Sequence, residues 1–239
     1  MSRKYRQEMV YTRPGKQWCV WILTVGVLGM VLPGGCGLVG LVGSETPSEK
    51  KVAAEFAPAG FKDKKILVYV EQPGWLNAGV NLRYHLTDLI IATFVEKVKL
   101  RHEQFISYDE LSGELAGRPG LRTMTAVEIG RELKADMVLL VSIDEFELDR
   151  VEVTNYYKGY LGAICSLSDV SSGRKLWPES DDGRSIRVGF EAASGGQTAA
   201  VARLAGAIAY CTVRYFYDCS SGKFKIGDER SSSEWKTWR

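Results

Sequence analysis

The stretches ILVYV (66–70) and MVLLV (137–141) decide the fold that this sequence predicts. Each is a short, unbroken apolar run, which is typical of a β-strand that is buried on both faces. The first run ends at Gln72-Pro73-Gly74, a combination that marks a turn. We therefore expect 66–70 to be a central strand and 137–141 to be a second buried strand.

The segment between these runs predicts two helices and one short strand. Apolar residues recur at helical spacing from Leu82 to Val98, with most charged residues off that stripe, so an amphipathic helix should pack on the sheet. A brief strand is expected at 105–108, and a surface loop at 116–120. The next helix begins after Thr125, where Glu128 completes a pattern that resembles a capping box. The predicted order is strand, helix, strand, helix, strand.

The second half of the chain predicts hairpins and a final helix. The strand from 137 continues through Phe146 and Leu148, and a strand over 160–170 turns at 171–173 into 174–177. Another strand covers 186–190, and a helix with few charges covers 197–217, either well buried or shared with a partner. The fold class is α/β (α+β): one mixed sheet of about five to six strands with three helices, βαβαβ followed by β-hairpins and a C-terminal helix.

The first 36 residues have the order of an export signal. Five basic residues between Arg3 and Lys16 precede a compact apolar core over 18–32, and small residues then lead to Cys36. This order resembles a bacterial lipoprotein signal, although Pro33 stands where that family prefers leucine. The resemblance implies that Cys36 is lipidated, with palmitate among its acyl groups, and becomes the mature N-terminus.

An uncleaved anchor is the alternative. The uncharged stretch from Trp18 to Gly43 is long enough to cross a bilayer, which takes about 20 residues. Both alternatives keep the positive charge in the cytoplasm and place everything after Ser44 outside it, on the periplasmic face of the inner or outer membrane. We expect a signal or anchor over 1–36, a flexible tether over 37–64, a folded domain over 65–219 and a disordered tail over 220–239.

The charge balance argues against a nucleic-acid partner. The chain has 31 basic and 29 acidic residues, and removing the five basic residues and Glu8 that precede Cys36 leaves 26 against 28. A nearly neutral domain lacks the basic surface that binds phosphate backbones.

The sequence offers no clear catalytic, cofactor or metal site. His85 and His102 do not have the spacing of a helical zinc pair, and no phosphate-binding glycine loop or nucleophile elbow occurs. The carboxylates between Asp144 and Asp149 form the only candidate for an enzyme such as a hydrolase, but alternation along a strand should separate Asp144 from Glu145. A helix cap explains residues 194–198 more simply than an anion site.

The cysteines of the folded part are expected to be unpaired core residues at Cys165 and Cys211. One disulfide involving Cys165, Cys211 or Cys219 stays open.

Two segments resemble the curli-secretion (CsgG) and TolB N-terminal lipoprotein group. They are residues 134–143, a helix end that enters an apolar strand, and residues 166–177, a hairpin that contains Asp169-Val170, Gly173 and Leu176-Trp177. The resemblance covers about 65–219 and implies an envelope lipoprotein with an α/β domain. The predicted function is a non-enzymatic, protein-binding accessory of a secretion, transport or cell-wall assembly, whose partner is an envelope protein or a second copy. A subunit of an oligomeric outer-membrane export channel is the alternative.

Overall fold

The computed structural model describes residues 51–76, 80–151 and 155–220, with the side chains of 191–193 left aside. Its α-helices are α1 (Leu82–Thr93), α2 (Tyr108–Gly117), α3 (Ala126–Glu132) and α4 (Gly196–Val213). Its strands are β1 (Lys51–Val52), β2 (Ile66–Glu71), β3 (Phe105–Ile106), β4 (Met137–Arg150), β5 (Tyr157–Asp169), β6 (Lys175–Trp177), β7 (Arg184–Ala193) and β8 (Cys219–Ser220). Short helical turns are η1 (Pro58–Phe61), η2 (Gly74–Leu76), η3 (Phe94–Val98), η4 (His102–Gln104), η5 (Pro119–Thr123) and η6 (Arg214–Phe216).

Six strands form one mixed sheet, which confirms the predicted fold class. The order is β3-β2-β4-β5, and β6 and β7 both pair with β5. Strand β2 runs parallel to β3 and β4, whereas β4, β5 and β7 are antiparallel neighbours. The two stretches that predicted the fold pair directly, with Ile66 opposite Met137 and Val70 opposite Val141. Strand β2 is interior, as predicted.

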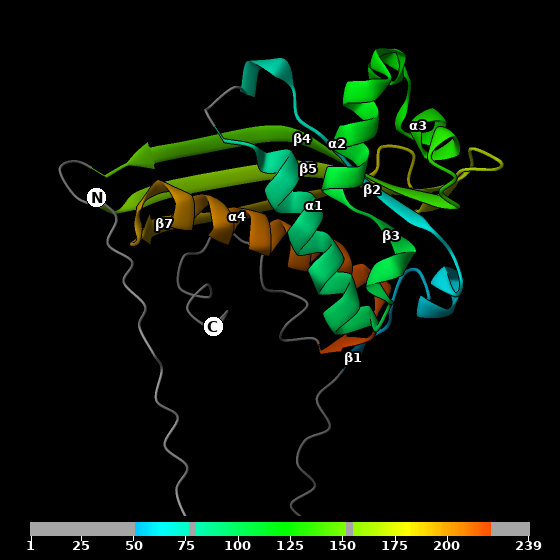
Figure 1. Ribbon diagram of the computed structural model, residues 1–239. Coiled ribbons are helices and arrows are strands. Elements are labelled where there is room, and N and C mark those ends of the chain that lie inside the picture. The colour runs from blue at the N-terminus through cyan, green and yellow to red at the C-terminus, as the bar shows by residue number, and fades with distance from the viewer. Residues whose placement is uncertain (1–50, 77–79, 152–154, 221–239) are drawn as a thin grey trace, which may run out of the picture. The chain divides into compact units, whose positions relative to one another are not determined.

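Helices cover both faces of this sheet (Figure 1). On one face, Val68, Leu139 and Leu161 belong to the larger core cluster, together with buried residues of α1 and α4. On the other face, Leu67 and Val138 pack with Leu111 of α2 and Ile129 of α3 in a smaller cluster. The smaller cluster reaches only the first residues of β2 and β4, so the rest of that face stays largely uncovered by the described helices.

Helix α4 takes the well-buried position that its composition predicted. Alanines at 200, 205, 207 and 209 are at most 1% exposed and let the helix backbone approach both α1 and the sheet. Leu204 packs closely on Gly159: a Cβ added to Gly159 would lie 3.0 Å from the Cδ1 atom of Leu204. None of the described helices is long and apolar enough to span a bilayer.

The described residues form four α-helices rather than the three predicted, and the additional helix is α2. Ser107 caps this helix by accepting a hydrogen bond from the Glu110 backbone N–H. Gly113 and Gly117 lower the helix propensity of the segment, and Leu111 is its only fully buried residue. Packing of Leu111 against the sheet therefore contributes stability that local sequence did not indicate.

The expected start of the domain at Lys65 is wrong, because residues 51–64 are part of the folded unit. Strand β1 pairs with β8, and Phe61 is 0% exposed in the core. Its ring packs edge-on against Phe56 and Phe216, with centroids 4.9 and 5.5 Å apart. Only residues 37–50 of the predicted tether lie outside the described part of the chain, as does the predicted tail from 221 onward.

Glu55 fastens this segment to the hairpin that carried the family resemblance. Its carboxylate accepts hydrogen bonds from Trp177 Nε1 at 2.8 Å and from Arg184 Nη2 at 2.6 Å. Asp169 stabilises the turn that follows it by accepting hydrogen bonds from Ser171 and Ser172, which lower the pKa of Asp169 to about 2. Gly173 has a φ of +68°, a conformation that favours glycine. The motif thus forms a tight turn, and Trp177 after this turn contacts Glu55 in the segment 51–64.

Removing residues 47–64 should destabilise the domain substantially. Residues Pro47–Arg239 form a compact unit, so a chain that starts at Pro47 is the reference for one that starts at Lys65. We expect the shorter chain to lose at least about 3 kcal/mol of unfolding free energy, because the cavity left by Phe61 alone costs roughly that much. Urea unfolding measures the difference, and equal midpoints would mean that the segment adds nothing to the fold.

Candidate interaction surface

The carboxyl ends of β2 and β3 form the place in this fold where a binding site is expected. Strand β2 leads into α1 on one face of the sheet, and the adjacent parallel strand β3 leads into α2 on the other face. In open α/β sheets, ligands bind where neighbouring strands send their connections to opposite faces. The first turns of α1 and α2 meet at this point.

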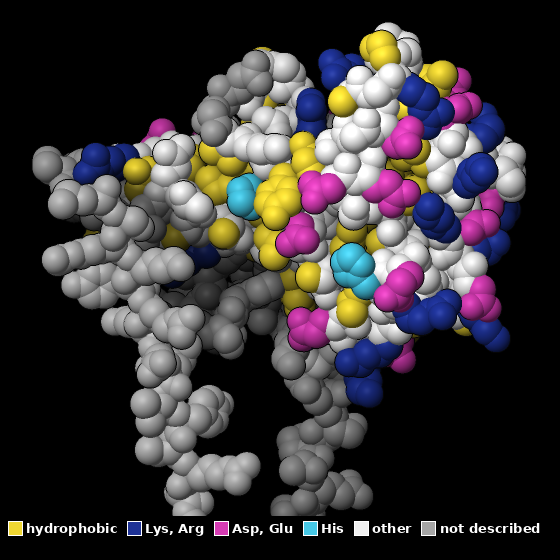
Figure 2. Space-filling model, in the orientation of Figure 1, with side chains coloured by type: hydrophobic (Ala, Val, Ile, Leu, Met, Phe, Trp, Pro, Cys, Tyr) yellow, Lys and Arg dark blue, Asp and Glu magenta, His cyan; other side chains and the backbone are white. Residues whose placement is uncertain are grey.

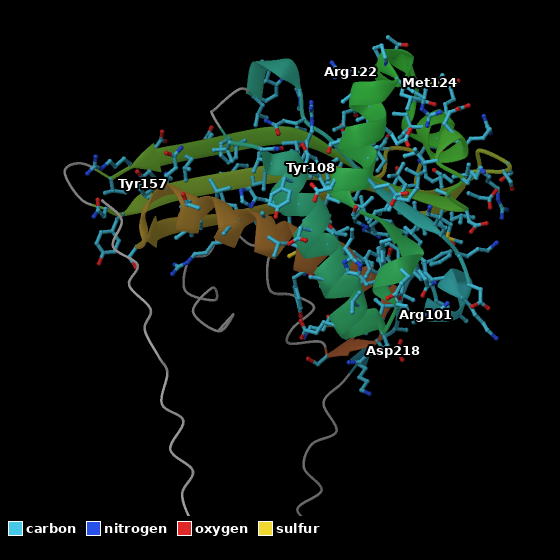
Figure 3. The ribbon with its side chains drawn as sticks, in the orientation of Figure 1. Arg101, Tyr108, Arg122, Met124, Tyr157 and Asp218 are labelled. Atoms are coloured by element: carbon cyan, nitrogen blue, oxygen red, sulfur yellow. The ribbon has the colours of Figure 1, made fainter. Side chains whose placement is uncertain are left out.

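Two tyrosines and one asparagine hold these helix starts together. Asn81 caps α1, since its side-chain oxygen accepts a hydrogen bond from the Tyr84 N–H, and its Nδ2 donates to Tyr108 Oη at 3.1 Å. The Tyr108 side chain reaches from the start of α2 toward the first turn of α1 (Figure 3). The Tyr84 and Tyr108 rings meet edge to face, with centroids 5.6 Å apart and planes at 78°.

We call Asn81, Tyr84, His85 and Tyr108 the Tyr84–Tyr108 surface. Tyr84 is 45% exposed although it belongs to a helix whose opposite face is fully buried. The His85 ring lies 5.5 Å from the Tyr84 ring. Trp75, which is 70% exposed, lies on the connection that leads from β2 into α1. Exposed aromatic side chains on rigid elements are typical of protein-binding surfaces.

The neighbouring end of β2 is held by polar contacts. Gln72 Nε2 donates to the Leu76 and Val80 carbonyls, and Arg83 Nη2 donates to the Gln72 carbonyl. Burial raises the pKa of Tyr69 above its usual value; Glu71 adds to the rise and Arg83 opposes it. These bonds tie Gln72, just after β2, to Leu76, Val80 and Arg83.

The predicted separation of Asp144 and Glu145 is wrong. A β-bulge places both residues opposite Gly162, so both side chains lie on the same face of the sheet. An added Cβ at Gly162 would lie 2.7 Å from Asp144 Oδ1 and 3.1 Å from Glu145 Cβ. Arg187 pairs with Asp144 at 2.7 Å and approaches Glu145 at 3.8 Å, so an ion pair accounts for this part of the acidic segment.

The remaining candidates do not come together as a site. His85 lies in α1 and the exposed His102 in η4, and the described residues contain no group of three or more His, Cys, Asp or Glu side chains that could hold a metal. Gly195, with a φ of 106°, is the N-cap of α4, and no side chain caps that helix. Cys36, the Trp18–Gly43 stretch and the tail tryptophans Trp235 and Trp238 lie outside the described residues.

The three cysteines of the described domain, Cys165, Cys211 and Cys219, are buried, and no disulfide joins them. Cys165 is 0% exposed, and burial raises the pKa of its thiol to about 12. Its sulfur lies 3.5 Å from Thr212 Oγ1 of α4, which identifies it as a core contact between sheet and helix. A protonated, enclosed thiol is a poor nucleophile.

Comparison with known proteins finds solved structures that match this chain at low identity and low TM-score. Solved structures that resemble the chain include lipoprotein GNA1162 from Neisseria meningitidis (16% identical, TM-score 0.37, covering 60% of this chain and 93% of that one). Others are the PelC dodecamer from Paraburkholderia phytofirmans (15%, TM-score 0.37, 70% and 94%) and the LpoB C-terminal domain from Salmonella enterica (17%, TM-score 0.32, 59% and 85%). No protein-family model and no curated protein matches the sequence. The resemblance to the CsgG and TolB group stays a prediction.

Replacing Gly162 with alanine should destabilise the sheet, because the new methyl group would collide with Asp144 and Glu145. We expect a loss of about 1–3 kcal/mol, the usual cost of overpacking. Gly113→Ala is the matched control: nothing lies within 4 Å of its position in α2, so that change should stabilise by roughly 0.5–1 kcal/mol. Thermal unfolding compares the two variants, and a neutral Gly162→Ala would contradict the bulge geometry.

Proposed function

We propose that this protein is a membrane-anchored, extracytoplasmic lipoprotein that acts without catalysis. It binds another protein component of an envelope assembly that serves secretion, transport or cell-wall synthesis. The Tyr84–Tyr108 surface is the observation that carries the binding role. The leader that ends at Cys36 is what supports the location.

The surface suits protein binding because Asn81 and Tyr84 are exposed, Tyr108 is half-buried beside them, and these side chains are held in place. The Asn81 bond fixes the Tyr108 ring, and α1 fixes Tyr84, so little side-chain freedom is lost when a partner covers them. Tyrosine also offers a hydroxyl at the rim of a large apolar ring, a combination that is favoured at interfaces. The surface follows the carboxyl ends of parallel strands, where this class of sheet positions ligands.

A photo-reactive phenylalanine analogue at position 84 should capture the partner in living cells. We expect one dominant adduct with an envelope protein, because the side chain at this position is 45% exposed on a rigid helix. The same analogue at Tyr156, which is 48% exposed at the far end of the β4–β5 hairpin, is the matched control. An identical adduct pattern at both positions, or no adduct at position 84, would refute the binding role. A dominant adduct with a second copy would instead support the oligomeric alternative.

Replacing Cys36 should abolish lipidation and the processing that accompanies it. In Cys36→Ser the lipid acceptor is absent, so we expect an unmodified chain that is no longer processed at this residue. Cys19→Ser changes the other leader cysteine and should leave both the lipid and the fractionation intact. Intact mass and membrane fractionation provide the measurement. A wild-type chain that keeps its full leader and carries no lipid, and so differs in mass from Cys36→Ser only by the substitution, would favour the Trp18–Gly43 anchor.

A further inference from the structure

Carboxylates border the Tyr84–Tyr108 surface on both helices. Asp88 lies one helical turn after Tyr84 on the same face of α1, and Asp109 follows Tyr108 in the first turn of α2. Both are exposed. Figure 2 shows acidic side chains around the hydrophobic group where α1 and α2 meet, and most basic side chains farther away.

These two carboxylates are available to a partner. Within the described residues neither Asp88 nor Asp109 forms an ion pair, whereas Glu110 already pairs with Lys65 at 3.5 Å. Arg83, in the first turn of α1, donates a hydrogen bond to the Gln72 carbonyl. Ser107 caps α2, and the acidic residues of its first turn offset the positive end of the helix dipole.

An aromatic ring beside a carboxylate is a chemical match for a guanidinium group. The ring face attracts a cation, and the planar guanidinium can stack on that face while it donates hydrogen bonds to the carboxylate in its own plane. A lysine ammonium is more strongly hydrated and cannot stack in this way. Phosphate or carboxylate groups on a partner would be repelled by Asp88 and Asp109.

We propose that the partner of the Tyr84–Tyr108 surface presents an arginine side chain, which stacks on a tyrosine ring and pairs with Asp88 or Asp109. This inference rests on the proposed protein-binding function and adds the chemistry of the partner. It makes Asp88 and Asp109 specificity-determining residues of that site.

The test measures binding of a short probe to the full chain in detergent. The probe is an acetylated peptide of alternating glycine and arginine, compared with the same peptide made with lysine or with citrulline, which has the shape of arginine without its charge. We expect the arginine peptide to bind at least about threefold more tightly than the lysine peptide, and citrulline to abolish binding. Equal binding of the lysine or citrulline peptide would overturn the proposal.

Matched variants separate this site from general charge effects. The double change Asp88→Asn and Asp109→Asn should weaken arginine-peptide binding by about tenfold. The control Asp181→Asn and Asp182→Asn removes the same charge from an exposed turn and should weaken it by less than about twofold. Tyr84→Phe keeps the ring face and should bind, whereas Tyr84→Leu should not. Equal losses in both double variants would overturn the proposal.

The cross-link at position 84 distinguishes failure of this inference from failure of the proposed function. If the adduct forms equally well with and without Asp88→Asn and Asp109→Asn, the surface binds a partner without an arginine contact, and only the inference fails. If the double change removes the adduct and the Asp181/Asp182 control keeps it, the inference is supported. If no adduct forms at position 84 in the unaltered chain, the proposed function itself fails.

Discussion

The parallel pairing of β2 with β4 is the constraint on which the rest of this structure depends. Parallel strands are stable when both of their faces are covered, and Ile66, Leu67 and Val68 are all 0% exposed. The chain meets this requirement by sending α1 and α4 to one face and α2 with α3 to the other. The same division brings the starts of α1 and α2 together at the carboxyl ends of β2 and β3. The position of the Tyr84–Tyr108 surface is thus a consequence of covering two apolar strands.

The sequence was sufficient for elements whose signal is local and periodic. The two apolar runs, the stripe of α1 and the Thr125 capping box all appear where they were expected. Helix α2 was not predicted, because it buries one residue, Leu111, and contains two glycines. The bulge at Asp144 did leave a signal: inward-facing apolar residues fall at 139, 141 and 143 and then shift to 146 and 148. A change of spacing from two to three within a strand indicates one extra residue, and Gly162 on β5 provides the room for it.

The candidate surface and the domain boundary could not be predicted in the same way, because both depend on contacts between distant segments. Asn81 and Tyr108 are 27 positions apart, and only the pairing of β3 with β2 brings them within hydrogen-bonding distance. Phe56 and Phe61 lie in a segment rich in alanine, proline and lysine that reads as a tether. Both rings pack against Phe216, which is more than 150 positions later in the chain.

Helix α1 connects the two ends of the domain that matter for the proposed function. Tyr84 is near its start, and Phe94, directly after its end, packs against Phe61 and Phe216 with ring centroids 5.5 and 5.3 Å apart. Ten residues of helix separate these points by about 15 Å. Residues 51–61, which the sequence predicted to be part of the tether, are held at the Phe61 end, where β1 pairs with β8 and Glu55 binds Trp177 and Arg184. Residues 51–61 therefore lie at one end of α1, and the Tyr84–Tyr108 surface lies at the other. The orientation of that surface relative to residues 51–61 is set by packing within the domain.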